Sequence, residues 1–205
     1  MPAPPRSTIP TVSELPLVLA TKRLTLRPYM LADVDALWPH VSDPRLPPQM
    51  SWNAHANKDE TRAFVQRCIR GVTEGNGITW AILHDNELVG AIGLHGITFK
   101  HIAWRVDRAE LGYWVGIPFH RRGFMTEAAT EVVRFAFETL GLHKITVGCL
   151  DGNDGSRKII ERLGFRFIGR REDDVWRDGA WHAHLRYELL ASSYSDITTT
   201  IPVRR

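Results

Sequence analysis

The segment from Glu110 to Thr126 carries residue types that can hold a phosphate group. An apolar stretch runs into a turn that contains Arg121, Arg122 and Gly123, and Met125 then opens an amphipathic helix. The first backbone N–H groups of a helix have no partner within the helix, and the helix dipole adds a partial positive charge at the same end. A strand, turn and helix in this order therefore predict a site for a phosphate-bearing cofactor.

Hydrophobic spacing predicts the elements around this turn. From Met125 to Leu140 the apolar residues recur every three or four positions, which is one face of a helix, and Gly141 is suited to end it. His143–Leu150 is a short β-branched run and predicts a strand. Asn153 is then placed to cap a second, shorter helix.

These residues resemble motifs A and B of the GNAT N-acetyltransferases and, within that superfamily, the RimJ/RimL group. The matching pieces are ELGYWV, RRGFMTEA, the pair Asn153 and Ser156, and ERLGF, with TKRLTLRPYMLADVDAL near the start and VWRDGAWHAHLRYELL near the end. The resemblance extends from Leu17 to Leu190. It implies an α+β fold with a mixed, mostly antiparallel central sheet and helices on both faces, and it implies acetylation of a primary amine with acetyl-CoA as co-substrate.

The resemblance also implies which residues contact the cofactor. For the diphosphate of the cofactor, it implies contacts that are mainly through backbone N–H groups. These contacts come from Arg121, Arg122, Gly123, Phe124, Met125 and Thr126. Val115 and Ile117 are expected to present backbone groups to the pantetheine arm. Asn153 binds the pantetheine amides or caps its helix, and the two roles are compatible because a side-chain amide both donates and accepts hydrogen bonds.

Three positions depart from the usual GNAT pattern. His120 begins the turn, and Arg121 stands where a glycine is common. The backbone amides stay usable if the loop keeps its path, but a positive φ at Arg121 is costly. Ile160 occupies the place where many GNAT proteins have a general-acid tyrosine, and the RimJ/RimL pattern offers Ser156 instead.

Direct transfer of an acyl group from a thioester to an amine needs a proton acceptor near the amine and a donor near the leaving sulfur. The resemblance makes Glu110 the candidate base, directly or through a held water, and Ser156 the catalytic group near the sulfur. The alternatives are a Glu110 that is solvated or paired with Arg105 or Arg108, and a Ser156 that only caps its helix. Cys149 is expected to be a buried, small hydrophobic residue, not a nucleophile.

Composition narrows the class of protein. The chain has 205 residues, of which 43% are hydrophobic and 24% charged, as in a globular domain. No run is long enough to cross a bilayer and the start, MPAPPRSTIP, lacks the apolar core of a signal peptide, so we expect a cytoplasmic protein with no membrane partner. A net charge of +3 without a basic block predicts no direct nucleic-acid binding. The histidines show no metal-ligand spacing, so no metal is expected.

The chain is predicted to contain a flexible N-terminal tail at residues 1–14, a GNAT acetyltransferase domain at residues 15–190 and a C-terminal tail at residues 191–205. Residues 98–108 are predicted to be a partly extended, basic and aromatic connection. The remaining elements are predicted as strands at residues 23–29, 78–83, 87–97, 166–174 and 181–190, and as helices at residues 31–42 and 58–73.

The predicted function is acetyl-CoA-dependent N-acetylation, by direct attack, of a protein N-terminal α-amine or an amino-acid-like small amine. The alternatives are a non-catalytic acyl-CoA-binding module and an acetyltransferase for an antibiotic or a polyamine. Residues 44–57 and 98–108 are expected to line the acceptor cleft, with Trp104, Arg105 and Arg108 at its rim. Of Trp38, Trp52, Trp104 and Trp176, one or two are expected to wall this cleft, and the others are expected to be core residues. The sequence leaves open whether the protein is a monomer or a homodimer.

Overall fold

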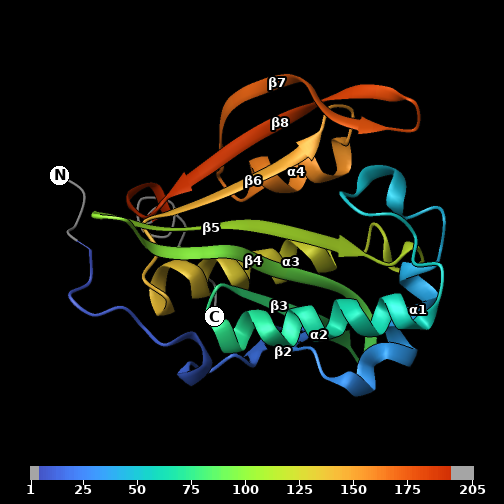
Figure 1. Cartoon of the computed structure of the whole chain (residues 1–205), viewed down its shortest axis with the longest axis horizontal. Helices are drawn as coiled ribbons and strands as arrows, with labels where there is room; N and C mark the ends of the chain where they lie inside the picture. Colours follow the sequence, from blue (N-terminus) through green and yellow to red (C-terminus); the bar gives the residue numbers. More distant parts are fainter. Residues whose placement is uncertain (1–4, 195–205) are drawn as a thin grey trace.

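The computed structural model of the chain describes residues 5–194, and within them eight strands form one sheet in the order β1-β2-β3-β4-β5-β6-β8-β7 (Figure 1). Within this described part, β5 and β6 form the one parallel pair and the other neighbours are antiparallel. The strands are β1 (Leu19–Ala20), β2 (Thr25–Pro28), β3 (Gly77–His84), β4 (Glu87–His101), β5 (Trp104–Val115), β6 (Lys144–Leu150), β7 (Arg166–Arg177) and β8 (Ala180–Leu190).

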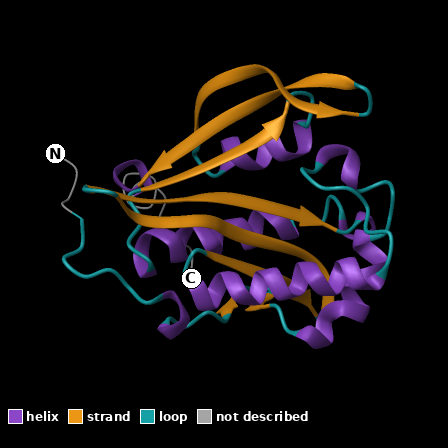
Figure 2. Ribbon diagram, in the orientation of Figure 1, coloured by secondary structure: helices purple, strands orange, loops and turns teal. Residues whose placement is uncertain are grey.

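Helices cover both faces of the sheet (Figure 2), which confirms the predicted α+β class. One apolar core forms where α1 (Val34–Val41) and α2 (Lys58–Glu74) pack on the sheet, and it includes Trp114 of β5. The larger core forms beneath α3 (Phe124–Arg134) and α4 (Asp154–Arg162) on the other face. Alternate residues of a strand point to opposite faces, so β5 contributes side chains to both cores.

The strands predicted at residues 78–83 and 87–97 form a hairpin with Asp85 and Asn86 at its turn. Both residues have positive φ, 49° and 66°, and they join β3 to β4 through a two-residue turn. The connection predicted at residues 98–108 is instead the far end of a second hairpin, in which β4 runs on to His101 and β5 starts at Trp104. Register shifts between His95 and Lys100 disturb the alternation, which is why the sequence pattern there was not that of a regular strand.

Two predicted helices differ in their details. The helix that opens near Met125 is α-helical from Phe124 to Arg134 and then widens into a π turn at Phe135–Thr139. The helix predicted at residues 31–42 begins as a 3₁₀ turn, Leu31–Asp33, before α1. In both cases the apolar periodicity predicted the buried face, while the exact hydrogen-bond pattern depends on packing.

The most consequential feature of the sheet is a split between β5 and β6. The two strands pair only from Arg108–Leu111 to Lys144–Val147. Beyond these pairs they diverge, as Figure 1 shows, so the backbone from Gly112 to Val115 has no neighbouring strand on its β6 side. Backbone groups left unpaired in this way are ready to bind an extended ligand.

The described parts of both terminal segments lie against the domain. Arg6 donates hydrogen bonds to the backbone oxygens of Thr139 (2.8 Å) and Glu138, and Val12 is buried in the larger core. Near the C-terminus, Tyr194 stacks on Phe137 with 5.0 Å between the ring centroids. Residues 1–4 and 195–205 of the predicted tails lie outside the described residues. Between residues 5 and 194, no helix has the length and apolar character needed to span a membrane.

Candidate active site

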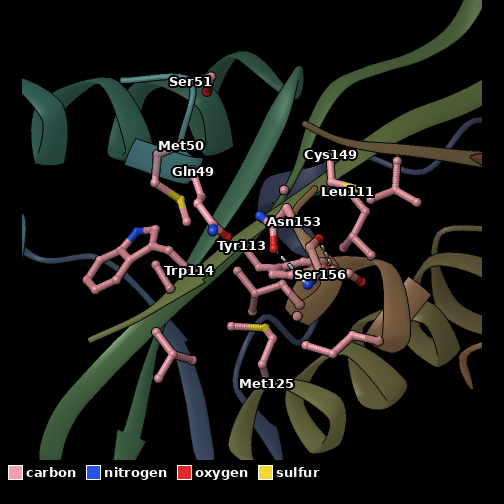
Figure 3. Close-up of a pocket in the computed structure, with 18 of the residues that line it drawn as sticks. Gln49, Met50, Ser51, Leu111, Tyr113, Trp114, Met125, Cys149, Asn153 and Ser156 are labelled. Carbon is pink, nitrogen blue, oxygen red and sulfur yellow. Dashed lines mark hydrogen bonds between the residues drawn. The ribbon is translucent and has the colours of Figure 1, made fainter. Parts of the chain in front are cut away.

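A cleft of about 1040 Å³ opens at the split between β5 and β6 (Figure 3). One half is lined from the side of α3 and α4 by the turn before α3 and by Met125, Asn153 and Ser156. The other half is lined by residues that include Trp52, His95 and Glu110. The cleft therefore joins the two faces of the sheet at the point where its strands part.

Strand β5 supplies the wall common to both halves. Tyr113 reaches toward α4, where its hydroxyl meets Ser156. Trp114 faces the opposite way and lies 6.2 Å from Trp52, measured between ring centroids. Gly112, between Leu111 and Tyr113, has no side chain, so the backbone itself borders the cleft at the split.

The turn before α3 has the geometry of an anion site. Gly123 caps α3 with a φ of 79°, which glycine adopts freely. Arg121 also has a positive φ, 62°, at a cost of roughly 1 kcal/mol for a residue with a Cβ, so the loop keeps its path in spite of the departure seen in the sequence. The turn residues that line the cleft are His120, Arg121, Gly123, Phe124, Met125 and Thr126.

Arg122, predicted with this group, is not among the lining residues. Its guanidinium lies 5.4 Å from the centre of the Phe119 ring, and its backbone oxygen accepts a hydrogen bond from Arg23 Nη1 (3.1 Å). The side chain is therefore held at the back of the turn, where its charge still acts on the same end of α3.

Glu127 ties α3 to the loop between β1 and β2. Its Oε1 accepts hydrogen bonds from Thr21 Oγ1 (2.6 Å) and from the Arg23 backbone N–H (2.8 Å), and its Oε2 accepts one from Arg23 Nε (2.7 Å). Burial alone would raise the pKa of Glu127, but these hydrogen bonds outweigh it and hold the pKa below its ordinary value. This ion pair fixes the first turn of α3 relative to the sheet.

Val115 and Ile117 differ in their relation to the cleft. Val115 lines it, and its backbone oxygen accepts a hydrogen bond from His120 Nε2 (2.8 Å). Ile117 begins a 3₁₀ turn, Ile117–Phe119, and packs against the smaller core, outside the lining. The backbone of β5 up to Val115 is therefore the part that borders the cleft.

Asn153, Ser156 and Tyr113 form a hydrogen-bonded group in the half of the cleft on the side of α3 and α4. Asn153 Oδ1 accepts a hydrogen bond from the Ser156 backbone N–H (3.0 Å), which is the predicted helix cap. Ser156 Oγ lies 2.9 Å from the Tyr113 hydroxyl. Burial raises the pKa of Tyr113 to about 12, so the phenol stays protonated at neutral pH. Sequence reasoning missed Tyr113, although its place in ELGYWV, two residues after the inward Leu111, put it on the same face.

Cys149 is buried on β6 beside this group, as expected. Burial raises the pKa of its thiol, and a hydrogen bond with Ser156 acts in the opposite direction. A protonated thiol is a poor nucleophile, so its state agrees with the prediction of a small hydrophobic residue.

Glu110 lies in the other half of the cleft, half-exposed at 48%, and its Oε1 accepts a hydrogen bond from Arg186 Nη1 of β8 (2.9 Å). The alternative pairing of Glu110 with Arg105 or Arg108 is not found in the structure. Arg105 pairs with Asp107 (2.5 Å), and neither arginine lines the cleft. The partner could not be found locally because Arg186 lies 76 residues away along the chain.

The wall of this half comes from the loop before α2, as expected, and from one face of β4. Gln49, Met50, Ser51 and Trp52 line it (Figure 3 labels the first three). Of the tryptophans predicted as walls, only Trp52 is a lining residue among those described. Trp104, expected at the rim, is 74% exposed at the far end of the β4–β5 hairpin.

Comparison with known proteins gives the family. The acetyltransferase (GNAT) domain family matches residues 23–166. YdaF of Bacillus subtilis is 35% identical over 116 residues, which is 56% of this chain and 60% of that protein. The [ribosomal protein uS5]-alanine N-acetyltransferase of Escherichia coli is 33% identical over 54% of this chain and 55% of that protein, so these two matches span little more than half of each relative.

Comparison with solved structures gives relatives of the same family. The solved structure of Mycobacterium smegmatis RimJ in complex with CoA-disulfide superimposes with a TM-score of 0.77 at 23% identity, over 89% of this chain and 93% of that one. With the domain match over most of the chain, the chain belongs to the GNAT family of acetyl-CoA-dependent N-acetyltransferases and within it resembles the RimJ/RimL group.

Proposed function

We propose that this protein transfers the acetyl group of acetyl-CoA to the α-amine of a peptide N-terminus or of an amino-acid-like small molecule. The observation that carries this proposal is the cleft through the sheet. It has a helix N-terminus at one end and, among the described residues that line it, a single carboxylate, Glu110, at the other. Such a passage lets two substrates approach each other from opposite faces of the sheet.

The cofactor half fits a molecule with a diphosphate and an extended amide-bearing arm. Backbone N–H groups from Gly123 to Thr126, with the charges of Arg121 and Arg122 nearby, would hold the diphosphate. The unpaired β5 backbone up to Val115 would bind the arm as a neighbouring strand does, with Asn153 across from it and Ile117 supporting the end of the strand. Acetyl-CoA, when bound, supplies the activated acetyl group.

Proton transfer decides the roles of the remaining groups. When a neutral amine attacks a thioester, the nitrogen loses one proton and the leaving sulfur must gain one. Ser156 is the donor on the sulfur side, and the Tyr113 hydroxyl bonded to it supports the loss of its proton. On the other side of the split, Glu110 attracts the amine by its charge and holds a water against it.

The charges of the acceptor half favour a singly charged amine. Among the described residues that line the cleft, Glu110 is the only carboxylate, and Arg186 neutralises part of its charge. A polyamine or an aminoglycoside needs several carboxylates to replace its hydration. An α-amine, with a pKa of about 8, also has a larger neutral fraction at pH 7 than a lysine side chain at about 10.4. The E. coli relative, by its name, acetylates a ribosomal-protein alanine, which supports a peptide acceptor.

A mass-shift assay tests this function. Purified protein and acetyl-CoA are incubated with short peptides that begin with alanine or serine, with free amino acids, with spermine and with an aminoglycoside. We expect an increase of one acetyl group on a peptide or amino acid, with kcat/KM at least tenfold above that for spermine or the aminoglycoside. Acetyl-CoA binding in calorimetry without transfer to any amine would indicate the non-catalytic alternative, and a polyamine as best acceptor would contradict the charge argument.

A further inference from the structure

His95 occupies a special place beside Glu110. The two residues are direct cross-strand partners on β4 and β5, so their side chains leave the sheet on the same face. Both line the acceptor half of the cleft. His95 has no hydrogen-bond partner among the described residues, which leaves its ring nitrogens available to a ligand.

The His95 ring lies on a floor made of two glycines. A Cβ on Gly93 of β4 would stand 2.9 Å from Nε2 and from Cε1 of this ring, and a Cβ on Gly112 of β5 would stand 3.2 Å from Nε2 and Cδ2. A Cβ contact of 2.9 Å essentially never occurs in proteins, so a side chain at Gly93 would displace the ring or the nearby Ile78 backbone oxygen, which also lies 2.9 Å away; the 3.2 Å contacts at Gly112 are only tight. The absence of both side chains lets the Nε2 edge lie flat over the two strands.

This floor coincides with the split in the sheet. Leu111 is the last residue of β5 that pairs with β6, and Gly112 is the next one. The Nε2 atom of His95 therefore lies above the point where the cleft passes from one face of the sheet to the other.

We propose that His95 is the catalytic base, which accepts through Nε2 the proton that the acceptor amine gives up; this inference rests on the proposed function. The new N–C bond forms as one N–H bond of the amine breaks and Nε2 gains the proton. The C–S bond breaks and the sulfur takes a proton from Ser156. The imidazolium then loses its proton to solvent and the Ser156 alkoxide takes one from solvent, so that the proton from the amine and the proton on the sulfur balance without a redox step.

The surroundings of His95 favour this role. The charged and titratable groups that face it are Glu110 from β5 and, across a small neighbouring cavity, Arg67 and Cys68 from α2. His95 is exposed by its accessible surface, but partial desolvation of its ring within the cleft lowers its pKa below the ordinary value, while the charge of Glu110 acts in the opposite direction. The ring is therefore neutral at pH 7 and able to accept a proton. Glu110 stabilises the imidazolium once it has formed.

His184 on β8 provides a matched control. It also lines the cleft and its ring lies over a glycine, Gly148 of β6. Its Nδ1 lies 3.3 Å from Asp174 Oδ2, so one ring nitrogen already has a partner. His184→Gln therefore removes an imidazole from the same cleft but leaves His95, the proposed base, in place.

The test compares His95→Gln and His184→Gln with the wild type, with an alanine-initiated hexapeptide as acceptor. We expect His95→Gln to lower kcat/KM at pH 7 by about 10²- to 10⁴-fold and to abolish the loss of rate that the wild type shows as pH falls through the histidine range. His184→Gln should change kcat/KM less than tenfold and keep that pH dependence. Acetyl-CoA affinity in calorimetry should be unchanged within twofold in both variants.

Three results would overturn the proposal: wild-type turnover in His95→Gln, an unaltered acidic limb of its pH profile, or a larger loss in His184→Gln. If His95→Gln does not fold, the His95 ring resonances of the wild type are followed by NMR, where addition of the hexapeptide must shift them and their apparent pKa. Unshifted resonances would contradict the assignment. If the wild type transfers no acetyl group, the proposed function is overturned together with the His95 assignment. If the wild type is active and only the His95 results fail, the assignment alone is overturned.

Discussion

The Tyr113 hydroxyl lies 2.9 Å from Ser156 Oγ and joins β5 to α4 at the split in the sheet. Ile160, which stands where many GNAT proteins have a tyrosine, is buried in the core. The phenol in this site therefore comes from strand β5 instead of helix α4, and it contacts the serine that we propose as the donor to sulfur.

We expect Ser156→Ala to lower kcat by about 10²-fold or more because the leaving sulfur loses its proton donor. Tyr113→Phe should lower kcat less, since it removes only the partner of that donor. The double variant should be no slower than Ser156→Ala, because two groups that act as a unit are not additive. Single-turnover kinetics with saturating acetyl-CoA measures this, and additive losses would show that the two hydroxyls act independently.

We expect Gly123→Val to weaken acetyl-CoA binding at least tenfold, because valine strongly disfavours a φ of 79° and the turn would lose its path. Gly179→Val is the matched control, since Gly179 also has a φ of 79° and a Cβ there meets no atom within 4 Å. Both variants carry similar backbone strain. A difference between their acetyl-CoA affinities, measured by calorimetry, would therefore come from the place of Gly123 in the turn. Equal affinities would remove the turn from the proposed diphosphate site.

Glu127→Gln should reduce the free energy of unfolding by about 1–3 kcal/mol at pH 7, since hydrogen bonds to a charged acceptor are lost. The folded-state pKa of Glu127 lies below its ordinary value of 4.5, so this stabilisation is complete above the unfolded-state pKa and is lost as pH falls through the folded-state pKa. Urea unfolding of variant and wild type should therefore differ above pH 4.5 and converge as pH falls below this value. Glu161→Gln, at an exposed position of α4, is the control and should change the free energy of unfolding little at any pH. A difference between Glu127→Gln and wild type that stays constant with pH would contradict the linkage.

Glu110→Gln should lower kcat/KM for a peptide acceptor by roughly 10- to 100-fold while leaving acetyl-CoA affinity unchanged, because it removes the charge that attracts the amine and stabilises the imidazolium. Glu188→Gln is the control: this carboxylate also lies in the sheet and is ion-paired, with Lys144 and Arg166, but it does not line the cleft. A 10²- to 10⁴-fold loss in kcat itself would assign the proton transfer to Glu110 instead of His95.

Cys149→Ala should keep kcat within about threefold of the wild type, since burial raises the pKa of this thiol and direct attack needs no acyl-enzyme. Quenched reactions analysed by mass spectrometry provide the second measurement. An acetylated Cys149 that passes its acetyl group to the peptide at the rate of turnover would overturn direct attack.

The sequence by itself determined the features that depend on a few neighbouring residues. Asn153 caps α4, the Asp85–Asn86 turn joins two strands, and Gly123 precedes α3 with the positive φ that its position requires. Each of these depends on backbone geometry and hydrogen bonds within four residues along the chain, which residue type controls directly. The phosphate-type turn could be predicted for this reason.

Only the tertiary structure decided which groups meet across the cleft. Arg186 reaches Glu110 from 76 residues away, Tyr113 reaches Ser156 from 43, and His95 lies over Gly112 because β4 and β5 pair in one register out of several. Residue types do not specify these contacts, because register and the point where β5 and β6 part result from the packing of the whole sheet between its two layers of helices. The acetyltransferase turn is thus a local property of the chain, whereas the proton path that we propose depends on how distant strands align.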